Sequence, residues 1–152
     1  MPYRGAYCMR IQPGDTNDHT VIEGDIDIAD DVTRWIRFAL HISDDFATSS
    51  DDIFNIWEFQ QAGGTVEGCI SLQITAATDL VEIGAADGTE AASGFTEITK
   101  GVWHVIEAKY TVSTGGSGVF DLYIDGVRRQ NLTSLTNAAA IGKGALGTQN
   151  TL

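Results

Sequence analysis

The stretch that decides the fold runs from residue 101 to residue 126 and reads GVWHVIEAKYTVSTGGSGVFDLYIDG. Apolar and polar residues alternate on both sides of the glycine-rich segment 113–117, a pattern that predicts two antiparallel strands joined by a loop. The second strand ends at Asp125-Gly126, a dipeptide that tolerates the positive φ angles of a tight hairpin turn. We therefore expect antiparallel β-structure in this part of the chain.

The same two-residue alternation recurs on either side of this stretch, whereas a helical period does not. Turn-forming residues such as Gly63-Gly64 separate the alternating segments. We expect strands at residues 6–12, 20–28, 33–43, 53–61, 67–75, 80–84, 95–99, 102–112 and 118–125. Short strands with turns between them predict an all-β fold, an antiparallel two-sheet sandwich of the jelly-roll kind.

The C-terminal part of the chain is less regular. Residues 137–141 include three successive alanines and could form a helical turn, and residues 147–152 contain no convincing last strand. We expect a single domain over residues 1–152, a length that buries a sizeable core without disulfides. The missing strand suggests either a fragment of a longer chain or a sheet edge that a neighbouring subunit completes.

The residues Trp103-His104, Tyr110 and 122–126 resemble the concanavalin A-like jelly rolls, especially their laminin-G-like branch, in which a strand opening on Trp-His precedes one ending on Asp-Gly. This resemblance implies a concanavalin A-like sandwich with Trp103 packed in its core. Members of that superfamily bind sugars, proteins or calcium, hydrolyse glycans or build phage virions. The resemblance therefore predicts the fold but does not choose a function.

The net charge of −12, from 21 acidic and 9 basic residues, argues against a nucleic-acid groove, because phosphate contacts need clustered Lys and Arg. No apolar run approaches the roughly 20 residues of a membrane helix, and the first residues lack a signal peptide's apolar core. Cys8 and Cys69 specify neither a disulfide framework nor a zinc site; they could pair across neighbouring strands or stay free and buried.

Alternation within residues 33–43 places Ile36, Phe38, Leu40 and Ile42 on the core side. Trp35, Arg37 and His41 then share the opposite side, where they could stack on a sugar ring and bind its hydroxyls. We therefore take Trp35, Arg37 and His41 as the candidate ligand-binding set. The alternative is that Trp35 is covered by a second layer or a loop.

Glu23, Asp25 and Asp27 alternate along the expected strand 20–28. They resemble the Glu-x-Asp-x-Glu strand of concanavalin A-like glycosidases, whose outer glutamates are nucleophile and general acid; paired carboxyls suit a retaining mechanism. Asp27 stands where that family has Glu, however, and the motif lies near the N-terminus. An acidic row on a solvated strand also discourages edge pairing. We therefore expect no glycan hydrolysis here.

Two acidic loops are candidate calcium sites, because calcium prefers six to eight oxygen ligands. The candidate metal ligands are Asp15, Asn17 and Asp18 in one loop and Asp44 and Asp45 in another, with Asp51 and Asp52 nearby. Loop aspartates also cap turns through backbone amides, which is the alternative interpretation. His19, His41 and His104 show no metal spacing, and no nucleophile motif is present.

We expect a non-catalytic structural or attachment module of a surface assembly, above all a phage virion component such as a capsid decoration, fibre or tail protein. Its partners would be other protein subunits in an oligomer, without nucleic acid or membrane insertion, located at a virion or an extracellular surface. The alternative is a carbohydrate-binding module of a larger extracellular protein, with calcium assistance. A diverged glycoside hydrolase is the third alternative.

Overall fold

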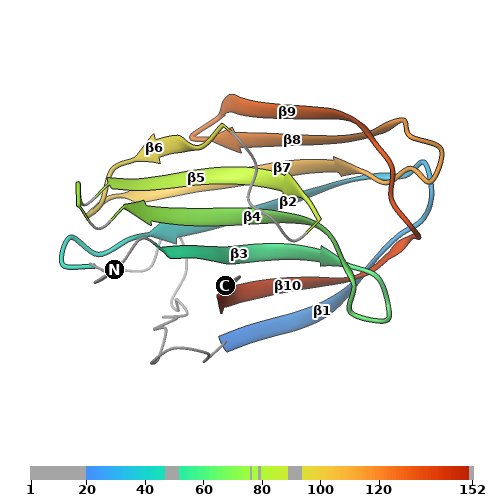
Figure 1. Cartoon of the computed structure of the whole chain (residues 1–152), viewed down its shortest axis with the longest axis horizontal. Helices are drawn as coiled ribbons and strands as arrows, with labels where there is room; N and C mark the ends of the chain where they lie inside the picture. The colour runs from blue at the N-terminus through green and yellow to red at the C-terminus, as the bar shows by residue number, and fades with distance from the viewer. Residues whose placement is uncertain (1–19, 47–51, 76, 79, 89–93, 151–152) are drawn as a thin grey trace.

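The computed structural model describes residues 20–46, 52–75, 77–78, 80–88 and 94–150, and these form ten strands and no helix. Figure 1 shows the strands of the larger sheet in order from β6 to β1. This sheet, sheet A, contains β1 (Thr20–Ile28), β10 (Ile141–Asn150), β3 (Asp52–Gln60), β4 (Val66–Thr75), β5 (Leu80–Asp87) and β6 (Thr96–Ile98). Sheet B contains β2 (Thr33–His41), β7 (Trp103–Thr111), β8 (Gly118–Ile124) and β9 (Val127–Leu135).

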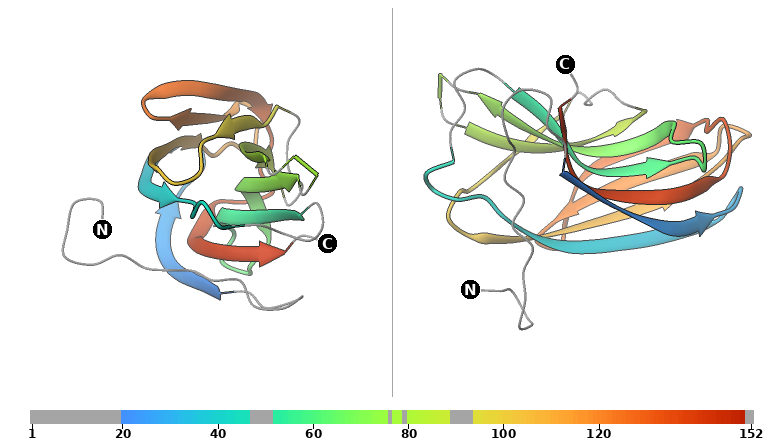
Figure 2. Two further views of the ribbon diagram at one scale, coloured as in Figure 1. Left: turned by 90° about the vertical axis from the view of Figure 1, so that its left-hand side faces the viewer. Right: turned by 90° about the horizontal axis from the view of Figure 1, so that it is seen from below.

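Every pairing in both sheets is antiparallel. Figure 2 shows the sheets as two layers, with the apolar core between them. The prediction of an all-β, antiparallel jelly-roll sandwich is confirmed. The described residues contain no helix of the length and apolarity needed to cross a membrane.

The expected strands from residue 20 onward are present, with bounds that differ by a few residues. The expected strand 6–12 lies outside the described residues. Two observed strands, β9 and β10, were missed. β9 reads VRRQNLTSL and has a largely exposed, polar surface, so it carries little apolar alternation.

β10 corrects the expectation that the chain reaches residues 147–152 without a convincing last strand. It reads IGKGALGTQN and pairs with β1 on one side and β3 on the other, so it is an internal strand of sheet A. A side chain at Gly142 would meet the backbone of Ala62 at 3.1 Å, and one at Gly144 would meet the Trp57 ring at 2.7 Å. Gly142 and Gly144 therefore allow close packing inside a sheet. The expected helical turn at 137–141 is absent.

An aromatic cluster joins the sheets at the centre of the core. The ring of Phe59 in β3 stacks on Tyr110 in β7, with centroids 4.4 Å apart. Phe120 in β8 meets both rings edge-on, at 5.7 Å and 5.1 Å. All three side chains are fully buried. Edge-to-face and offset contacts of this kind add to the burial of apolar area.

The Trp-His and Asp-Gly residues form one structural unit. Asp125 and Gly126 have φ angles of 52° and 77°, the positive values expected of the hairpin turn between β8 and β9. Asp125 Oδ2 lies 2.7 Å from His104 Nδ1, and its Oδ1 accepts the Val105 N–H at 2.8 Å. Trp103, by contrast, is only half-buried and faces outward on β7, where its ring meets His41 at 5.1 Å. The prediction that Trp103 packs in the core is wrong.

Candidate functional site

A hydrogen-bonded polar cluster lies on the face of sheet A that points away from the core. It consists of Asn55, Glu58 and Gln60 from β3 with Cys69 and Ser71 from β4. We call it the Glu58 cluster. The two amides donate to separate oxygens of the Glu58 carboxylate, Asn55 at 3.0 Å and Gln60 at 2.6 Å. Ser71 Oγ donates to Asn55 Oδ1 at 2.8 Å.

A β-bulge in β3 makes this arrangement. Strict alternation over residues 53–61 would place Asn55 and Glu58 on opposite faces, because they are three residues apart. The register with β4 shifts between Asn55 and Trp57, so Asn55 lies opposite Ser71 and Glu58 opposite Cys69. The same bulge turns Trp57 toward the core, where its ring stacks with Phe38 at 6.2 Å. Alternation alone would therefore not bring Asn55 and Glu58 together.

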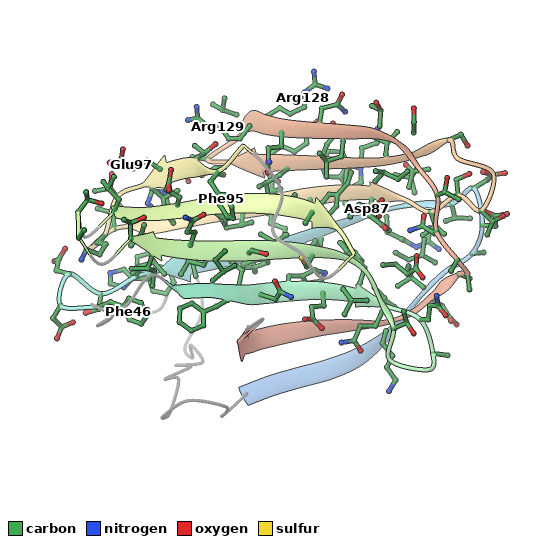
Figure 3. The ribbon with its side chains drawn as sticks, in the orientation of Figure 1. Phe46, Asp87, Phe95, Glu97, Arg128 and Arg129 are labelled. Carbon is green, nitrogen blue, oxygen red and sulfur yellow. The ribbon has the colours of Figure 1, made fainter. Side chains whose placement is uncertain are left out.

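The Glu58 cluster is almost closed to solvent. Glu58 is 4% exposed, and Asn55, Cys69 and Ser71 are buried with it. A buried carboxylate needs hydrogen-bond donors on its oxygens, and the two amides supply them. On the β5 side, Phe95 lies against Gly84, where an added side chain would meet its ring at 2.9 Å (Figure 3). The cluster is thus fixed in position by packing and hydrogen bonds together.

Gln60, itself only 8% exposed, is the member of the cluster that pairs with β10. Lys143 of β10 is the cross-strand partner of Gln60, and paired residues carry their side chains on the same face. Lys143 is half-buried and is the single basic residue in the described strands of sheet A. The Lys143 amine and the Gln60 amide therefore lie side by side on this face, Lys143 being the more exposed of the two.

The Cys69 thiol in the cluster is not reactive. Cys69 is fully buried and is a free cysteine, and Cys8 lies outside the described residues. Burial raises the pKa of the Cys69 thiol from 9.0 to about 11, although the Ser71 hydroxyl opposes the shift. The thiol therefore stays protonated near neutral pH and is no nucleophile.

A second buried carboxylate, Glu67, links β4 by hydrogen bonds to the segment between β9 and β10. It accepts hydrogen bonds from Gln61 Nε2, from Asn137 Nδ2 at 3.3 Å and from the Ala138 N–H at 3.0 Å. Tyr110 Oη donates to the Glu67 carbonyl at 2.8 Å, and burial raises the pKa of this phenol. These contacts hold the β9–β10 connection against β4, which is a structural task.

The predicted ligand-binding set lies on the opposite side of the molecule, on the outer face of sheet B. Trp35 is 58% exposed, so the alternative that a layer or loop covers it is wrong. Its ring lies 5.5 Å from Tyr123, and Arg37 Nε lies 3.6 Å from Glu107. Trp35, Arg37 and His41 thus share the predicted face, while the core positions Ile36, Phe38, Leu40 and Ile42 face inward.

The acidic row of β1 is interrupted. The register between β1 and β10 shifts between Asp25 and Ile28, and Asp27 has a φ angle of 36°. Asp27 is exposed, and the regular two-residue alternation from Glu23 does not continue to it. The paired-carboxylate geometry that a glycosidase needs is therefore not supported at Asp27.

The proposed calcium ligands are described only in part. Asp15, Asn17, Asp18 and Asp51 lie outside the described residues. Asp44 and Asp45 are exposed in the turn after β2, where Asp45 accepts a hydrogen bond from Ser43 Oγ. No group of three or more His, Cys, Asp or Glu side chains converges in the described parts of the chain. Calcium binding stays a prediction.

Comparisons with known proteins identify a family to which the chain belongs. Residues 1–145 match the model of a protein family described as polysaccharide lyase. An endo-beta-1,4-glucuronan lyase from the fungus Trichoderma reesei has 14% identity and a TM-score of 0.56, covering 90% of this chain and 65% of that one. A mutant of alginate lyase Aly36B in complex with alginate tetrasaccharide has 15% identity and a TM-score of 0.60, covering 85% and 64%. No curated protein matches the sequence.

At such low identity, likeness to these structures shows the fold alone, and this chain spans just under two thirds of their lengths. The family match nevertheless corrects two predictions. A non-catalytic module of a phage virion, and a chain that is not an enzyme, are both contradicted by membership of a family of lyases. Sequence reasoning looked for hydrolytic carboxylates and nucleophiles, and so overlooked the polar residues Asn55, Glu58 and Gln60 within an apolar strand. Their presence in that strand was the available signal.

Proposed function

Because the chain belongs to the polysaccharide lyase family, we propose that it cleaves a uronate-containing polysaccharide by elimination at the outer face of sheet A. The structures with TM-scores above 0.5 include lyases named for glucuronan and alginate, both polymers of uronic acids. The observation that carries the proposal is the Glu58 cluster, a buried carboxylate that holds two amides in place beside Lys143. Preorganised polar groups of this kind are what a reacting charge requires.

Elimination from a uronate makes two demands on an enzyme. The carboxylate must be neutralised, so that the neighbouring carbon can lose its proton, and a positioned group must take that proton. The released electron pair forms a carbon–carbon double bond as the glycosidic carbon–oxygen bond breaks, and the departing oxygen takes up a proton. The product is an unsaturated uronate.

Gln60 and Lys143 are placed for the first contact with substrate. Gln60 uses one amide N–H for Glu58, and a primary amide has a second N–H that can bind a uronate carboxylate. The Lys143 amine, in its neutral form, takes the proton from the carbon beside that carboxylate and passes it to the departing glycosidic oxygen, so the proton is returned while the Gln60 amide holds the carboxylate. Glu58 acts beneath them as a positioning residue, because it orients the amides of Gln60 and Asn55 without reaching solvent.

The test is an elimination assay, following the ultraviolet absorbance of unsaturated uronate with glucuronan and alginate as substrates. Lys143→Ala and Lys143→Arg should each lower kcat/KM by at least about a hundredfold, because arginine keeps the charge but cannot give up its proton. Glu58→Gln should lower kcat more than it raises KM, since it disturbs the amides beneath the substrate. Lys100→Ala is the matched control; Lys100 bonds the Phe46 carbonyl at 3.0 Å, away from sheet A's outer face.

Folded wild-type protein that releases no unsaturated product from either polymer would overturn the proposed substrate class. Full activity in Lys143→Ala would overturn the assigned role of Lys143. Membership of the laminin-G-like branch, assembly with other subunits and a location at a virion or an extracellular surface stay predictions.

A further inference from the structure

The two sheets carry opposite charge. The described strands of sheet B contain five basic residues and two acidic ones, whereas those of sheet A contain nine acidic residues and Lys143. The basic residues of sheet B are Arg34, Arg37, Lys109, Arg128 and Arg129. The chain as a whole has a net charge of −12, so the strands of sheet B are net positive within an acidic protein, and Arg37, Lys109 and Arg128 lie on the outward face. Such a surface attracts anions.

Two neighbouring rows of outward side chains on sheet B each cross all four strands. One row consists of Arg37, Glu107, Tyr123 and Arg128, and the other of Trp35, Lys109, Asp121 and Asn131. Four strands at a spacing of about 4.8 Å give each row a length of roughly 14 Å, enough for several sugar rings in sequence. We call these residues the sheet B platform.

The platform offers apolar area and positive charge together. Trp35 is 58% exposed, and its ring is tilted against Tyr123, with centroids 5.5 Å apart. The Arg37 side chain lies beside it in β2 and is 63% exposed. Arg128 is also exposed, and Figure 3 shows it projecting from β9. An aromatic ring stacks on the apolar face of a sugar, and a guanidinium matches a carboxylate.

The cations of the platform are only loosely engaged by its own acids. Arg37 Nε is 3.6 Å from Glu107, and Lys109 and Arg128 lie 3.7 Å and 3.5 Å from the Asp121 oxygens. Contacts of this length at a surface contribute little free energy. Asp121 itself is buried and also accepts the Asn131 amide at 2.7 Å. An incoming carboxylate can therefore compete for Arg37 at small cost, and it can bind Arg128 while that guanidinium stays beside Asp121.

We propose that the sheet B platform is a second binding site for an anionic polysaccharide, separate from the elimination site on sheet A. Sugar rings stack on Trp35 and Tyr123, and uronate carboxylates bind Arg37 and Arg128. The choice of a uronate polymer rests on the proposed function, whereas the preference for an anionic chain rests on the charge of the platform. Holding the polymer on this face keeps it near the protein while another segment occupies sheet A.

Affinity electrophoresis and calorimetry with alginate and glucuronan test this, in the Lys143→Ala background so that the polymer stays intact. Trp35→Ala and Arg37→Ala should each weaken binding of the polymer roughly tenfold, the loss expected for one stacked ring or one carboxylate contact. Arg34→Ala is the matched control, because it removes the same charge from the same strand on the side opposite Arg37. Added salt and esterified polymer should weaken binding in the same way as Arg37→Ala.

The outcomes separate this proposal from the proposed function. Elimination by the wild type, with polymer affinity unchanged in both Trp35→Ala and Arg37→Ala, overturns the platform alone. Absence of elimination, with affinity lost in both variants, overturns the lyase proposal and supports the platform. Concentration-dependent mass in light scattering that disappears in Arg37→Ala would assign the platform to a second copy of the chain, whose acidic sheet A it would bind, and would overturn the polysaccharide proposal.

Discussion

The outer faces of the two sheets both carry glutamates, but these differ in burial and in hydrogen bonding. On sheet A, Glu58 is 4% exposed and both of its oxygens accept amide hydrogens. On sheet B, Glu107 meets Arg37 at 3.6 Å in a contact whose cation is mostly exposed. Burial makes the first carboxylate depend on its partners, and water makes the second nearly independent of them. The polar side chains on the outer face of sheet A are therefore held in fixed positions, whereas those on sheet B are accessible to solvent.

This difference bears on function. A site that moves a proton needs groups held in one place, which the Glu58 cluster provides. A site that holds a polymer needs exposed rings and charges over a long surface, which the sheet B platform provides. The acids of sheet A oppose an anionic substrate, so the proposed binding on sheet B would concentrate the polymer near the proposed elimination site on sheet A.

The largest expected effect on the free energy of unfolding comes from disrupting the aromatic cluster that lies between the two sheets. Phe59→Ala removes the ring that stacks on Tyr110 at 4.4 Å and meets Phe120, and so disconnects the sheets at their centre. We expect a loss of about 3–5 kcal/mol in the free energy of unfolding, the range for a truncated core phenylalanine. Urea denaturation followed by tryptophan fluorescence measures it. A loss below about 1 kcal/mol would mean that the aromatic cluster does not join the layers.

A matched pair of substitutions sharpens the comparison itself. Glu58→Ala leaves the Asn55 and Gln60 amides without their buried acceptor, and we expect it to cost about 1–3 kcal/mol. Glu107→Ala removes an acid from the other face, and we expect less than about 1 kcal/mol. Equal losses in the two variants, measured by the same denaturation experiment, would contradict the assignment of fixed geometry to sheet A.

The smallest expected effect is a difference in pH dependence between the sheets. The Thr114 backbone N–H and hydroxyl hold the pKa of Asp30 below its usual value, at a turn beside sheet B. Burial alone would raise the pKa of Asp125, but hydrogen bonds from Val105 and His104 outweigh it and lower that pKa. A lowered folded-state pKa adds stability that is present above the usual value near 3.8 and is lost as the pH falls through the folded value.

Asp87 at the end of β5 has the opposite sign. Desolvation, helped by the charge of Glu67, raises its pKa. Its ionised form therefore weakens the fold above that pKa, and protonation relieves the cost as the pH falls. We expect Asp125→Asn to flatten the loss of stability in acid and Asp87→Asn to raise stability slightly near neutral pH. Thermal unfolding at a series of pH values measures both effects. A change in Tm near neutral pH that has the same sign in the two variants would contradict this assignment.

Local sequence was enough to predict most of the fold. The strand at 20–28 has the same bounds in the structure, and the strands around the stretch 101–126 and its Asp125-Gly126 turn are present. The strands at 103–111 and 118–124 alternate regularly, so their side chains alone specify which face is buried. β10 was missed because its glycines carry no apolar signal; the packing of Ala62 and Trp57 against them explains why glycine stands there.

The candidate active site was not predicted, whereas the platform was predicted in part. Trp35, Arg37 and His41 lie on one strand, so alternation alone places them on one face. The Glu58 cluster depends on the bulge after Asn55 and on partners from β4, neither of which has a signature in the local sequence. The resemblance carried by Trp103-His104 and Asp125-Gly126 predicted the fold, because these residues build a turn.

The sequence by itself determined the strands, the class of fold and the aromatic and basic character of β2, because a two-residue period needs no partner to be read. The tertiary structure decided which strands lie side by side, and thereby placed Lys143 beside Gln60 and Arg128 in one row with Tyr123. It also decided that sheet A gathers the acids and sheet B most of the bases. Pairing between distant strands is a long-range property of the packed chain, and both proposed sites depend on it.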